Sequence, residues 1–201
     1  MIDSNGDIYN GEWLNDACNG YGELIKANGA VIRGIWKSNK REGKGSEIWT
    51  TGEKYTGNYQ NGQKSGFGVY TTTDGSIYRG EFNKNCIEGI GTFEWTDGSK
   101  YNGNWENNER NGSGTFAWTD GSNYEGQYQN DLKHGKGTYT FPSDSKLVGA
   151  WNKGKLEGDF TIYNLNENSP IKCKIENGGP VRVVNTAFSH LVNTIEDLLA
   201  S

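Results

Sequence analysis

The stretch YNGEWLNDACNGYGEL, residues 9–24, decides the fold of this chain. It reads aromatic-x-Gly-x-aromatic, then a short polar segment, then Gly-x-Gly-x-Leu, so that two short runs alternate with period two. Alternation of this kind predicts β-strands that each have one apolar face. Asn15 and Asp16, between the two runs, are typical of a tight hairpin turn. Residues 9–24 are therefore predicted to form one β-hairpin.

The same pattern recurs every 23 residues. Four glycine series, beginning at Gly6, Gly11, Gly20 and Gly22, repeat with this step and contain 26 of the 30 glycines. Two positions before the Gly11 series lie Tyr9, Ile32, Tyr55, Tyr78, Tyr101, Tyr124 and Leu147. Two positions after it lie Trp13, Trp36, Tyr59, Phe82, Trp105, Tyr128 and Trp151. A period of this length indicates a repeat architecture, and we predict seven hairpin repeats over residues 6–164, the last of them degraded.

The expected fold class is an all-β repeat array, an elongated and twisted single antiparallel sheet of stacked β-hairpins. Asn-Gly and Asp-Gly pairs, such as those at residues 28–29 and 97–98, provide turns between successive hairpins. All three prolines lie beyond residue 141, so none interrupts the sheet in the first six repeats. We expect Trp13 to face Gly20, and Gly22 to face Trp36, because each ring would then cover backbone that has no side chain.

The composition favours a fold held together by aromatic rather than aliphatic side chains. Leu, Ile, Val and Phe provide 36 of the 201 residues, less than the fifth of a chain that accompanies an ordinary core. The chain nevertheless has 7 Trp, 11 Tyr and 7 Phe, and its net charge of -5 is modest, which argues against disorder. The acidic balance also argues against binding of duplex nucleic acid.

The sequence predicts an intracellular protein in a reducing compartment. No run of about 18 apolar residues is present, and the first ten residues lack a basic region followed by an apolar one, so neither a membrane span nor a secretory signal is predicted. Three widely spaced cysteines, Cys18, Cys86 and Cys173, fit neither a disulfide framework nor a zinc site. We therefore expect a cytoplasmic location.

The repeating units resemble the MORN repeat (membrane occupation and recognition nexus). The resemblance is carried by a Tyr-x-Gly-x-aromatic motif followed by Gly-x-Gly, as in YNGEW (9–13), YTGNY (55–59), YRGEF (78–82), YNGNW (101–105) and YEGQY (124–128). Ile32, Leu147 and Glu47 depart from the pattern. The resemblance implies a hairpin array whose groove binds helices or extended peptides of partner proteins. It also implies a cytoskeletal or ciliary setting, notably the radial spokes of the axoneme, and an older and disputed association with phospholipids.

The two ends of the array differ in their predicted structure. The first strand is expected to be an open edge, which is a template for pairing with another chain. Residues 165–185 are expected to form a degenerate terminal hairpin. Residues 186–200 are expected to form an amphipathic helix, either a cap on the last hairpins or a docking helix, because apolar residues recur at steps of three and four: Phe188, Leu191, Val192, Ile195, Leu198 and Leu199.

The sequence contains no recognisable catalytic set, so we expect no enzyme activity, no cofactor and no metal. The two histidines, His134 and His190, do not form a metal-ligand pattern, and the Gly-x-Gly pairs lack the Lys-Ser/Thr of a phosphate-binding loop. One local basic cluster stands out, interrupted by Glu42. It is either a solvated loop or a contact for a lipid head group or an acidic partner, and consists of Lys37, Lys40, Arg41 and Lys44.

The aromatic face is the predicted binding site. A single-layer sheet has no second layer to bury so much apolar surface, and aromatic residues are enriched where proteins bind one another. The partner-binding residues are predicted to be Trp13, Trp36, Tyr59, Phe82, Trp95, Trp105, Trp118, Tyr128, Phe141 and Trp151. We expect a non-enzymatic scaffold or adaptor that binds a helix, an extended peptide or an edge strand within a larger axonemal complex. The alternative is a peripheral membrane adaptor that binds phospholipid.

Overall fold

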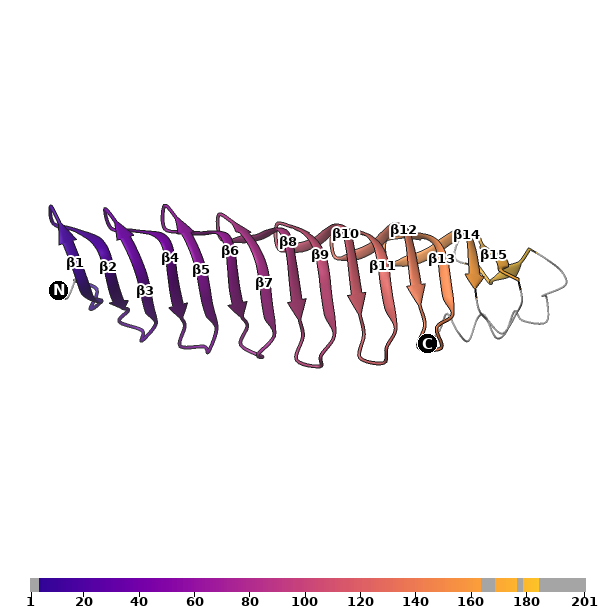
Figure 1. The fold of residues 1–201 in the computed structure, drawn as a ribbon, viewed down its shortest axis with the longest axis horizontal. Helices are drawn as coiled ribbons and strands as arrows, with labels where there is room; N and C mark the ends of the chain where they lie inside the picture. Colours follow the sequence, from indigo (N-terminus) through magenta and orange to yellow (C-terminus); the bar gives the residue numbers. More distant parts are fainter. Residues whose placement is uncertain (1–3, 164–168, 177–178, 185–201) are drawn as a thin grey trace. The chain divides into compact units, whose positions relative to one another are not determined.

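The regular structure of the protein consists of β-strands. The computed structural model describes residues 4–163, 169–176 and 179–184 (Figure 1). Within these residues the strands are β1 (Ile8–Leu14), β2 (Ala17–Ile25), β3 (Val31–Lys37), β4 (Lys40–Ile48), β5 (Lys54–Gln60), β6 (Gln63–Thr71), β7 (Ile77–Asn83), β8 (Cys86–Glu94), β9 (Lys100–Glu106), β10 (Glu109–Ala117), β11 (Asn123–Gln129), β12 (Leu132–Thr140), β13 (Lys146–Asn152), β14 (Lys155–Tyr163), β15 (Ile171–Ile175) and β16 (Arg182–Val183). The helix predicted over residues 186–200 lies outside the described residues.

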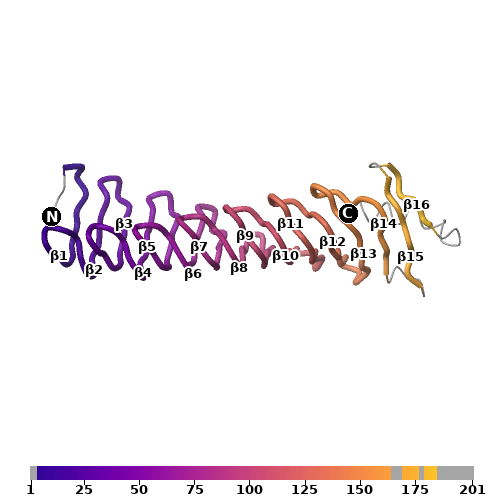
Figure 2. The backbone as a smooth tube through the Cα atoms, turned by 90° about the horizontal axis from the view of Figure 1, so that it is seen from above, coloured from indigo at the N-terminus to yellow at the C-terminus, as the bar shows by residue number. Residues whose placement is uncertain are grey.

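The chain divides into two compact units, residues 1–108 and residues 109–201. The first contains β1 to β9 and the second β10 to β16, and in each unit the order of the strands in the sheet is their order in the sequence. Neighbouring strands within a unit pair antiparallel, and successive hairpins stand side by side (Figure 2). The predicted all-β array of antiparallel hairpins is confirmed for each unit.

The turn inside each hairpin has two residues with positive φ. Asn15 and Asp16 have φ of 49° and 59°, as in the type I′ turn that matches the twist of two-stranded ribbons. Asn, Asp and Gly adopt this left-handed conformation most readily. Two successive residues with positive φ recur at the same repeat positions: Asn15-Asp16, Ser38-Asn39, Asn61-Gly62, Lys84-Asn85, Asn107-Asn108, Asn130-Asp131 and Lys153-Gly154.

The tips of adjacent hairpins are joined by the second residue of these turns. The backbone N–H of Asn39 donates to the carbonyl of Cys18 on the preceding hairpin, and the Cys18 N–H donates to Asn39 Oδ1 at 2.8 Å. Asn108 makes the same pair of bonds with Ile87. The asparagine side chain thus extends the backbone ladder beyond the end of the strands.

A buried serine closes three of the turns between hairpins, at Ser76, Ser99 and Ser122. Ser99 donates from its backbone N–H and from Oγ to Asp97 Oδ1, at 2.8 and 2.7 Å. These hydrogen bonds lower the pKa of the Asp97 carboxyl below its usual range, and Gly98 between the two residues has a φ of 91°. The predicted turn at Asp97-Gly98 is therefore present. The same Asp-Gly-Ser geometry occurs at Asp74 and Asp120.

The register predicted within the hairpin is wrong. Trp13 pairs with Cys18 rather than with Gly20, because the register shifts between Gly11 and Trp13. The neighbouring pair is Gly11 with Gly22. Between the Gly11–Gly22 pair and the Trp13–Cys18 pair, β2 has more residues than β1, so β2 forms a β-bulge there. Gly20 lies in the bulge with a φ of 77°, which explains a glycine at this position of the repeat.

The register predicted between hairpins is wrong by two residues. Gly22 pairs with Gly34 rather than with Trp36, and Trp36 pairs with Gly20. Consecutive strands therefore bring glycine opposite glycine in a row across the sheet, as the pairing of Gly45 with Gly57 shows. The pairs from Gly20–Trp36 to Ile25–Val31 follow one another without a shift, so the length of the turn at residues 26–30, rather than a bulge, sets this register.

A tyrosine, rather than the second aromatic residue of the repeat, covers the paired glycines. A Cβ atom on Gly80 or Gly91 would lie 2.3 or 2.2 Å from the hydroxyl oxygen of Tyr78. That hydroxyl donates to the Glu81 carbonyl at 3.0 Å, so the ring lies along its own strand. The same hydroxyl-to-carbonyl bond is made by Tyr9, Tyr55, Tyr101 and Tyr124. In the seventh hairpin Leu147 replaces the tyrosine, and Phe160 replaces the second glycine.

Aromatic rings form the core within each unit. The Tyr78 ring meets Phe82 of its own hairpin and Trp105 of the next one edge-on, with centroids 5.3 and 5.5 Å apart. Edge-to-face contacts at such distances are favourable beyond the area that they bury. This interlocking of neighbouring hairpins buries the rings although each unit has only one layer of sheet.

Candidate protein-binding surface

The sheet of each unit has two distinct faces, because side chains alternate along a strand. We call the face that carries the tyrosine series at Tyr9, Tyr55 and Tyr78 the tyrosine face, and the other the open face. Tyr55 and Tyr59 on the tyrosine face are buried, whereas Thr56 on the open face is exposed. The alternation predicted from the sequence is therefore present in the strands.

Most of the predicted partner-binding residues belong to the core of the tyrosine face. Seven of the ten side chains are only 3–7% exposed: Trp36, Tyr59, Phe82, Trp105, Tyr128, Phe141 and Trp151. Neighbouring rings cover them, as the packing of Trp105 against Tyr78 and Tyr101 illustrates. Trp13 on β1 is 41% exposed, and Trp95 and Trp118 are half-buried. Partner binding by this set remains a prediction.

Lysine side chains occupy the space between the half-buried rings of the tyrosine face. Lys64 Nζ lies 4.6 Å from the centroid of Trp49 and 5.1 Å from that of Tyr70. Lys133 Nζ lies 4.8 Å from the centroids of both Trp118 and Tyr139. Burial, with a smaller contribution from Arg110, lowers the pKa of Lys133 to about 8. The sequence analysis did not identify these lysines, since each lies outside the aromatic motif.

The basic cluster predicted from the sequence is divided between the two faces. Arg41 lies on the tyrosine face, where Nη1 bonds Glu47 Oε2 at 2.7 Å and Nη2 bonds the Gly62 carbonyl at 3.1 Å. Lys37 and Lys40 pair with each other one position away from the Trp36–Arg41 pair, so alternation places them on the open face. Lys44 also lies on the open face, opposite Asn58.

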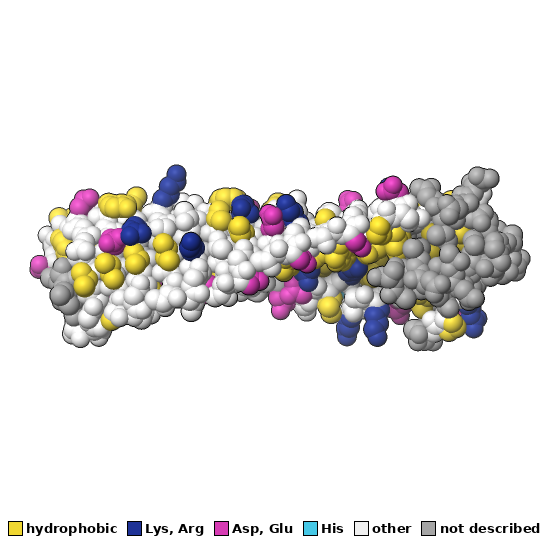
Figure 3. All heavy atoms as spheres, turned by 90° about the horizontal axis from the view of Figure 1, so that it is seen from below, with side chains coloured by type: hydrophobic (Ala, Val, Ile, Leu, Met, Phe, Trp, Pro, Cys, Tyr) yellow, Lys and Arg dark blue, Asp and Glu magenta, His cyan; other side chains and the backbone are white. Residues whose placement is uncertain are grey.

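Large apolar side chains protrude from the open face of the first unit. They occupy the central position of the Gly-x-Gly motif, where Tyr21, Phe67 and Ile90 are 60%, 59% and 61% exposed. The equivalent residues of the other repeats are polar: Lys44, Ser113, Lys136 and Asp159. Figure 3 shows, over the N-terminal part of the first unit, hydrophobic side chains with charged side chains of both signs among them. The apolar character of this row is therefore confined to the first unit.

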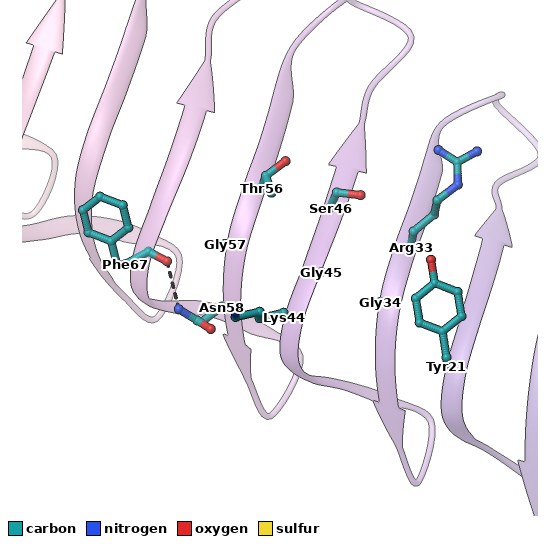
Figure 4. A pocket seen from close by; sticks show the side chains of 10 residues that line it. All are labelled: Tyr21, Arg33, Gly34, Lys44, Gly45, Ser46, Thr56, Gly57, Asn58 and Phe67. Carbon is teal, nitrogen blue, oxygen red and sulfur yellow. Dashed lines mark hydrogen bonds between the residues drawn. The ribbon is translucent and has the colours of Figure 1, made fainter.

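A cleft of about 500 Å³ lies between Tyr21 and Phe67. Figure 4 shows Tyr21 and Phe67 at its two ends, with strands β3, β4 and β5 between them. The backbone at Gly34, Gly45 and Gly57 forms part of its lining. The remaining lining residues are Arg33, Lys44, Ser46, Thr56 and Asn58.

Hydrogen bonds hold the walls of the cleft in place. Asn58 Nδ2 donates to the Phe67 carbonyl at 3.0 Å, and the Tyr21 N–H donates to Glu12 Oε1 at 3.1 Å. Both bonds bridge the bulge of their hairpin, so the residue at the centre of Gly-x-Gly is anchored through its backbone. The sequence could have indicated this surface, because Tyr21 and Phe67 are apolar residues at the centre of the Gly-x-Gly motif, and alternation places that position on the face opposite the tyrosine series.

The described residues contain no cluster of three or more His, Cys, Asp or Glu side chains arranged to hold a metal ion. The part of the chain that the structure describes contains no helix long and apolar enough to cross a membrane.

The fold and this surface define a β-hairpin repeat protein with an exposed apolar cleft in a single-layer sheet. The MORN repeat pattern matches residues 9–31, 33–54, 55–77, 78–100, 101–123 and 124–146. The chain therefore belongs to the MORN repeat family, with six matched repeats. The hairpin β13–β14 lies beyond the last match and is paired in the same antiparallel way. No curated protein matches the chain.

The solved structures to which the chain is similar include two TCP domains. The TCP domain of Drosophila melanogaster SAS-4 (dCPAP), solved in complex with a proline-rich motif of Ana2 (dSTIL), is 11% identical, with 83% of this chain and 85% of that chain covered and a TM-score of 0.49. The TCP10 domain of Danio rerio CPAP, solved in complex with a STIL peptide, is 14% identical, with 90% and 84% covered and a TM-score of 0.37. These similarities concern the fold alone.

Proposed function

We propose that this protein is a non-enzymatic scaffold that binds partner proteins through the open face of its first unit. The observation that carries the proposal is the row of Tyr21, Phe67 and Ile90, which are about three-fifths exposed beside a preformed cleft. Tyr21 and Phe67 stand at the two ends of one cleft, and exposed aromatic side chains at a cleft are typical of the sites where binding energy concentrates.

The tyrosine face contributes less to this proposal than the sequence predicted. Its rings are buried mainly against one another, and Lys64 and Lys133 occupy the gaps between half-buried rings. Trp95 and Trp118 keep part of their surface accessible, and Trp13 is exposed on β1, so a secondary contact through these three residues belongs to the proposal.

The cellular setting is proposed from the family resemblance. MORN repeat proteins serve in cytoskeletal and ciliary assemblies, and we propose that this chain is a component of such an assembly, most specifically of an axonemal radial spoke. Localisation of the tagged protein in ciliated cells tests this setting. A diffuse distribution with no enrichment in the axoneme would contradict it.

The protein-binding function is tested by purifying the protein with its partners from its own cells. Phe67→Ser should lose the partners of the wild type, and it should fold, because Ser113 occupies the same position in another repeat. Lys136→Ser is the matched control at that position in the second unit and should retain them. If both variants retain the same partners, the open face of the first unit is not the binding site.

The tyrosine face is tested separately with Trp95→Thr and Trp118→Thr, since Thr72 occupies this repeat position naturally. Loss of partners only in these two variants would assign binding to the tyrosine face instead. Sedimentation with phosphatidylserine vesicles at two salt concentrations tests the alternative of a peripheral membrane adaptor, because charge-driven lipid binding weakens as salt rises.

A further inference from the structure

Positive charge surrounds the cleft of the first unit. Arg33 and Lys44 line it, and none of its lining residues carries a carboxylate. Lys37 and Lys40 lie exposed on the same face of the β3–β4 hairpin. The whole chain has a net charge of -5, whereas the lining of the cleft contains two cations and no carboxylate.

The nearest carboxylates are engaged by the protein itself. Glu23 pairs with Arg33 Nε at 2.5 Å. Glu42, which interrupts the basic cluster in the sequence, accepts the Asn61 N–H at 3.0 Å. Glu12 accepts the Tyr21 N–H. Glu12 and Glu42 keep their negative charge, because a backbone N–H does not neutralise a carboxylate, and Glu23 offsets Arg33. Lys44 is exposed in the lining itself, where no carboxylate lies beside it.

The spacing of the apolar side chains fits an extended peptide. Tyr21 on β2 and Phe67 on β6 are separated by four strand steps, or about 19 Å at the usual spacing of 4.8 Å between strands. An extended chain rises about 3.3 Å per residue, so it covers this distance in about six residues. A peptide that crosses the strands can thus place one apolar side chain against Tyr21, another against Phe67, and the residues between them over Lys44.

We propose that the cleft binds an acidic, extended segment of a partner protein with two apolar side chains about six residues apart. This inference rests on the proposed function and adds the chemistry of the partner. Complementary charge raises association rates and selects among partners, while the apolar anchors provide most of the affinity. The cleft is recessed between Tyr21 and Phe67, a shape that suits a peptide better than the flat surface of a bilayer.

Three fluorescein-labelled peptides of twelve residues test the proposal by fluorescence anisotropy on the full chain. The first has two leucines six positions apart with aspartate and serine between them. The second has lysine in place of aspartate, and the third has serine in place of leucine. The first peptide is expected to bind at least tenfold more tightly than either of the others, and its affinity should fall as salt rises.

Two matched charge reversals locate the binding. Lys44→Asp and Lys136→Asp change the same position of the Gly-x-Gly motif, alter the net charge equally, and introduce the residue found at Asp159. Lys44→Asp should weaken binding of the first peptide at least tenfold, whereas Lys136→Asp should leave its affinity within twofold. Equal effects of the two variants would overturn the proposal, because they would show attraction to net charge rather than to the cleft.

The remaining outcomes separate this inference from the proposed function. Preference for the lysine peptide would overturn it, as would phosphatidylserine vesicles that displace the first peptide and bind in its place. If no peptide binds while Phe67→Ser still removes the cellular partners, the proposal of an acidic peptide is wrong, but partner binding through the open face of the first unit is supported. If Phe67→Ser also leaves those partners unchanged, both proposals are wrong.

Discussion

Replacing Gly91 with alanine should destabilise the first unit because no room exists for one more methyl group. A Cβ atom at this position would lie 2.2 Å from Tyr78 Oη and 2.5 Å from both Cε2 and Cζ of the same ring. The ring is fully buried between Phe82 and Trp105 and is bonded to the Glu81 carbonyl, so it has no free space into which to move.

The magnitude follows from what the displaced ring loses. Overpacking of this kind costs about 1–3 kcal/mol. Loss of the hydroxyl hydrogen bond adds about 1 kcal/mol, and weakened edge-to-face contacts add about 0.5–1 kcal/mol. Alanine also reduces the conformational freedom of the unfolded chain, which returns about 0.5–1 kcal/mol. The expected net loss is about 3 kcal/mol in the free energy of unfolding.

The chain itself suggests the decisive control. Leu147 occupies the tyrosine position in the seventh hairpin, where Phe160 stands in place of the second glycine. In a Tyr78→Leu background Gly91→Ala should therefore cost only about 1 kcal/mol, which gives a coupling free energy of about 2 kcal/mol between the two sites. Urea unfolding of the four proteins of this cycle, followed by tryptophan fluorescence and by far-UV circular dichroism, measures it.

Two results of this cycle would refute the reasoning. If the effects of Tyr78→Leu and Gly91→Ala add to within about 0.5 kcal/mol, the tyrosine is not what excludes a side chain from Gly91. A Gly91→Ala protein as stable as the wild type would show that the aromatic layer can shift at no cost. The comparison requires that both probes report one transition, since repeat proteins can unfold in parts.

Three further predictions concern the turns and a buried lysine. Asn108→Ala should lower the free energy of unfolding by about 1–2 kcal/mol, because it removes the bond to the Ile87 N–H and places alanine at a φ of 70°; Asn108→Gly, which keeps the turn, should lose less in the same urea assay. The pKa of Asp97 is lowered by its bonds from Ser99, so its contribution to stability is present near neutral pH and lost as pH falls through the lowered value; the melting temperature of Asp97→Asn should fall less than that of the wild type between pH 7 and pH 3, and an equal fall would contradict this. Burial lowers the pKa of Lys133 to about 8, so the folded state binds its proton less readily than the unfolded state; the melting temperature of the wild type relative to Lys133→Leu should rise from pH 7.5 to pH 10, and an unchanged difference would show that Lys133 is solvated.

The hairpins were predictable because the signals that specify them are local. Asn15-Asp16 favours positive φ at two successive residues whatever surrounds the chain, and alternation along a strand follows from the geometry of the strand itself. Each of these signals is weak in one hairpin, but the same motif recurs every 23 residues, so the repeats together made the prediction firm. The family resemblance rested on the same residues, and the matched repeats at residues 9–146 bear it out.

The register and the exposed surface were decided only in three dimensions. The bulge at Gly20 changes which residues face each other, and period-two alternation carries no information about it. Burial of Trp36 and Trp105 depends on tyrosines of the preceding hairpin. Lys64 lies over Tyr70 of its own hairpin and over Trp49 of the preceding turn only after the chain has folded.

The sequence by itself determined that this chain is an array of β-hairpins, because turn geometry and strand alternation are properties of a few consecutive residues. Only the tertiary structure decided which aromatic residues are core and which surface can bind. Exposure depends on neighbours in the adjacent hairpin, about 23 residues away, and the pairing between hairpins sets which neighbours those are. The cleft between Tyr21 and Phe67 takes its lining from five consecutive strands, β2 to β6, so it forms only when the hairpins pair with one another.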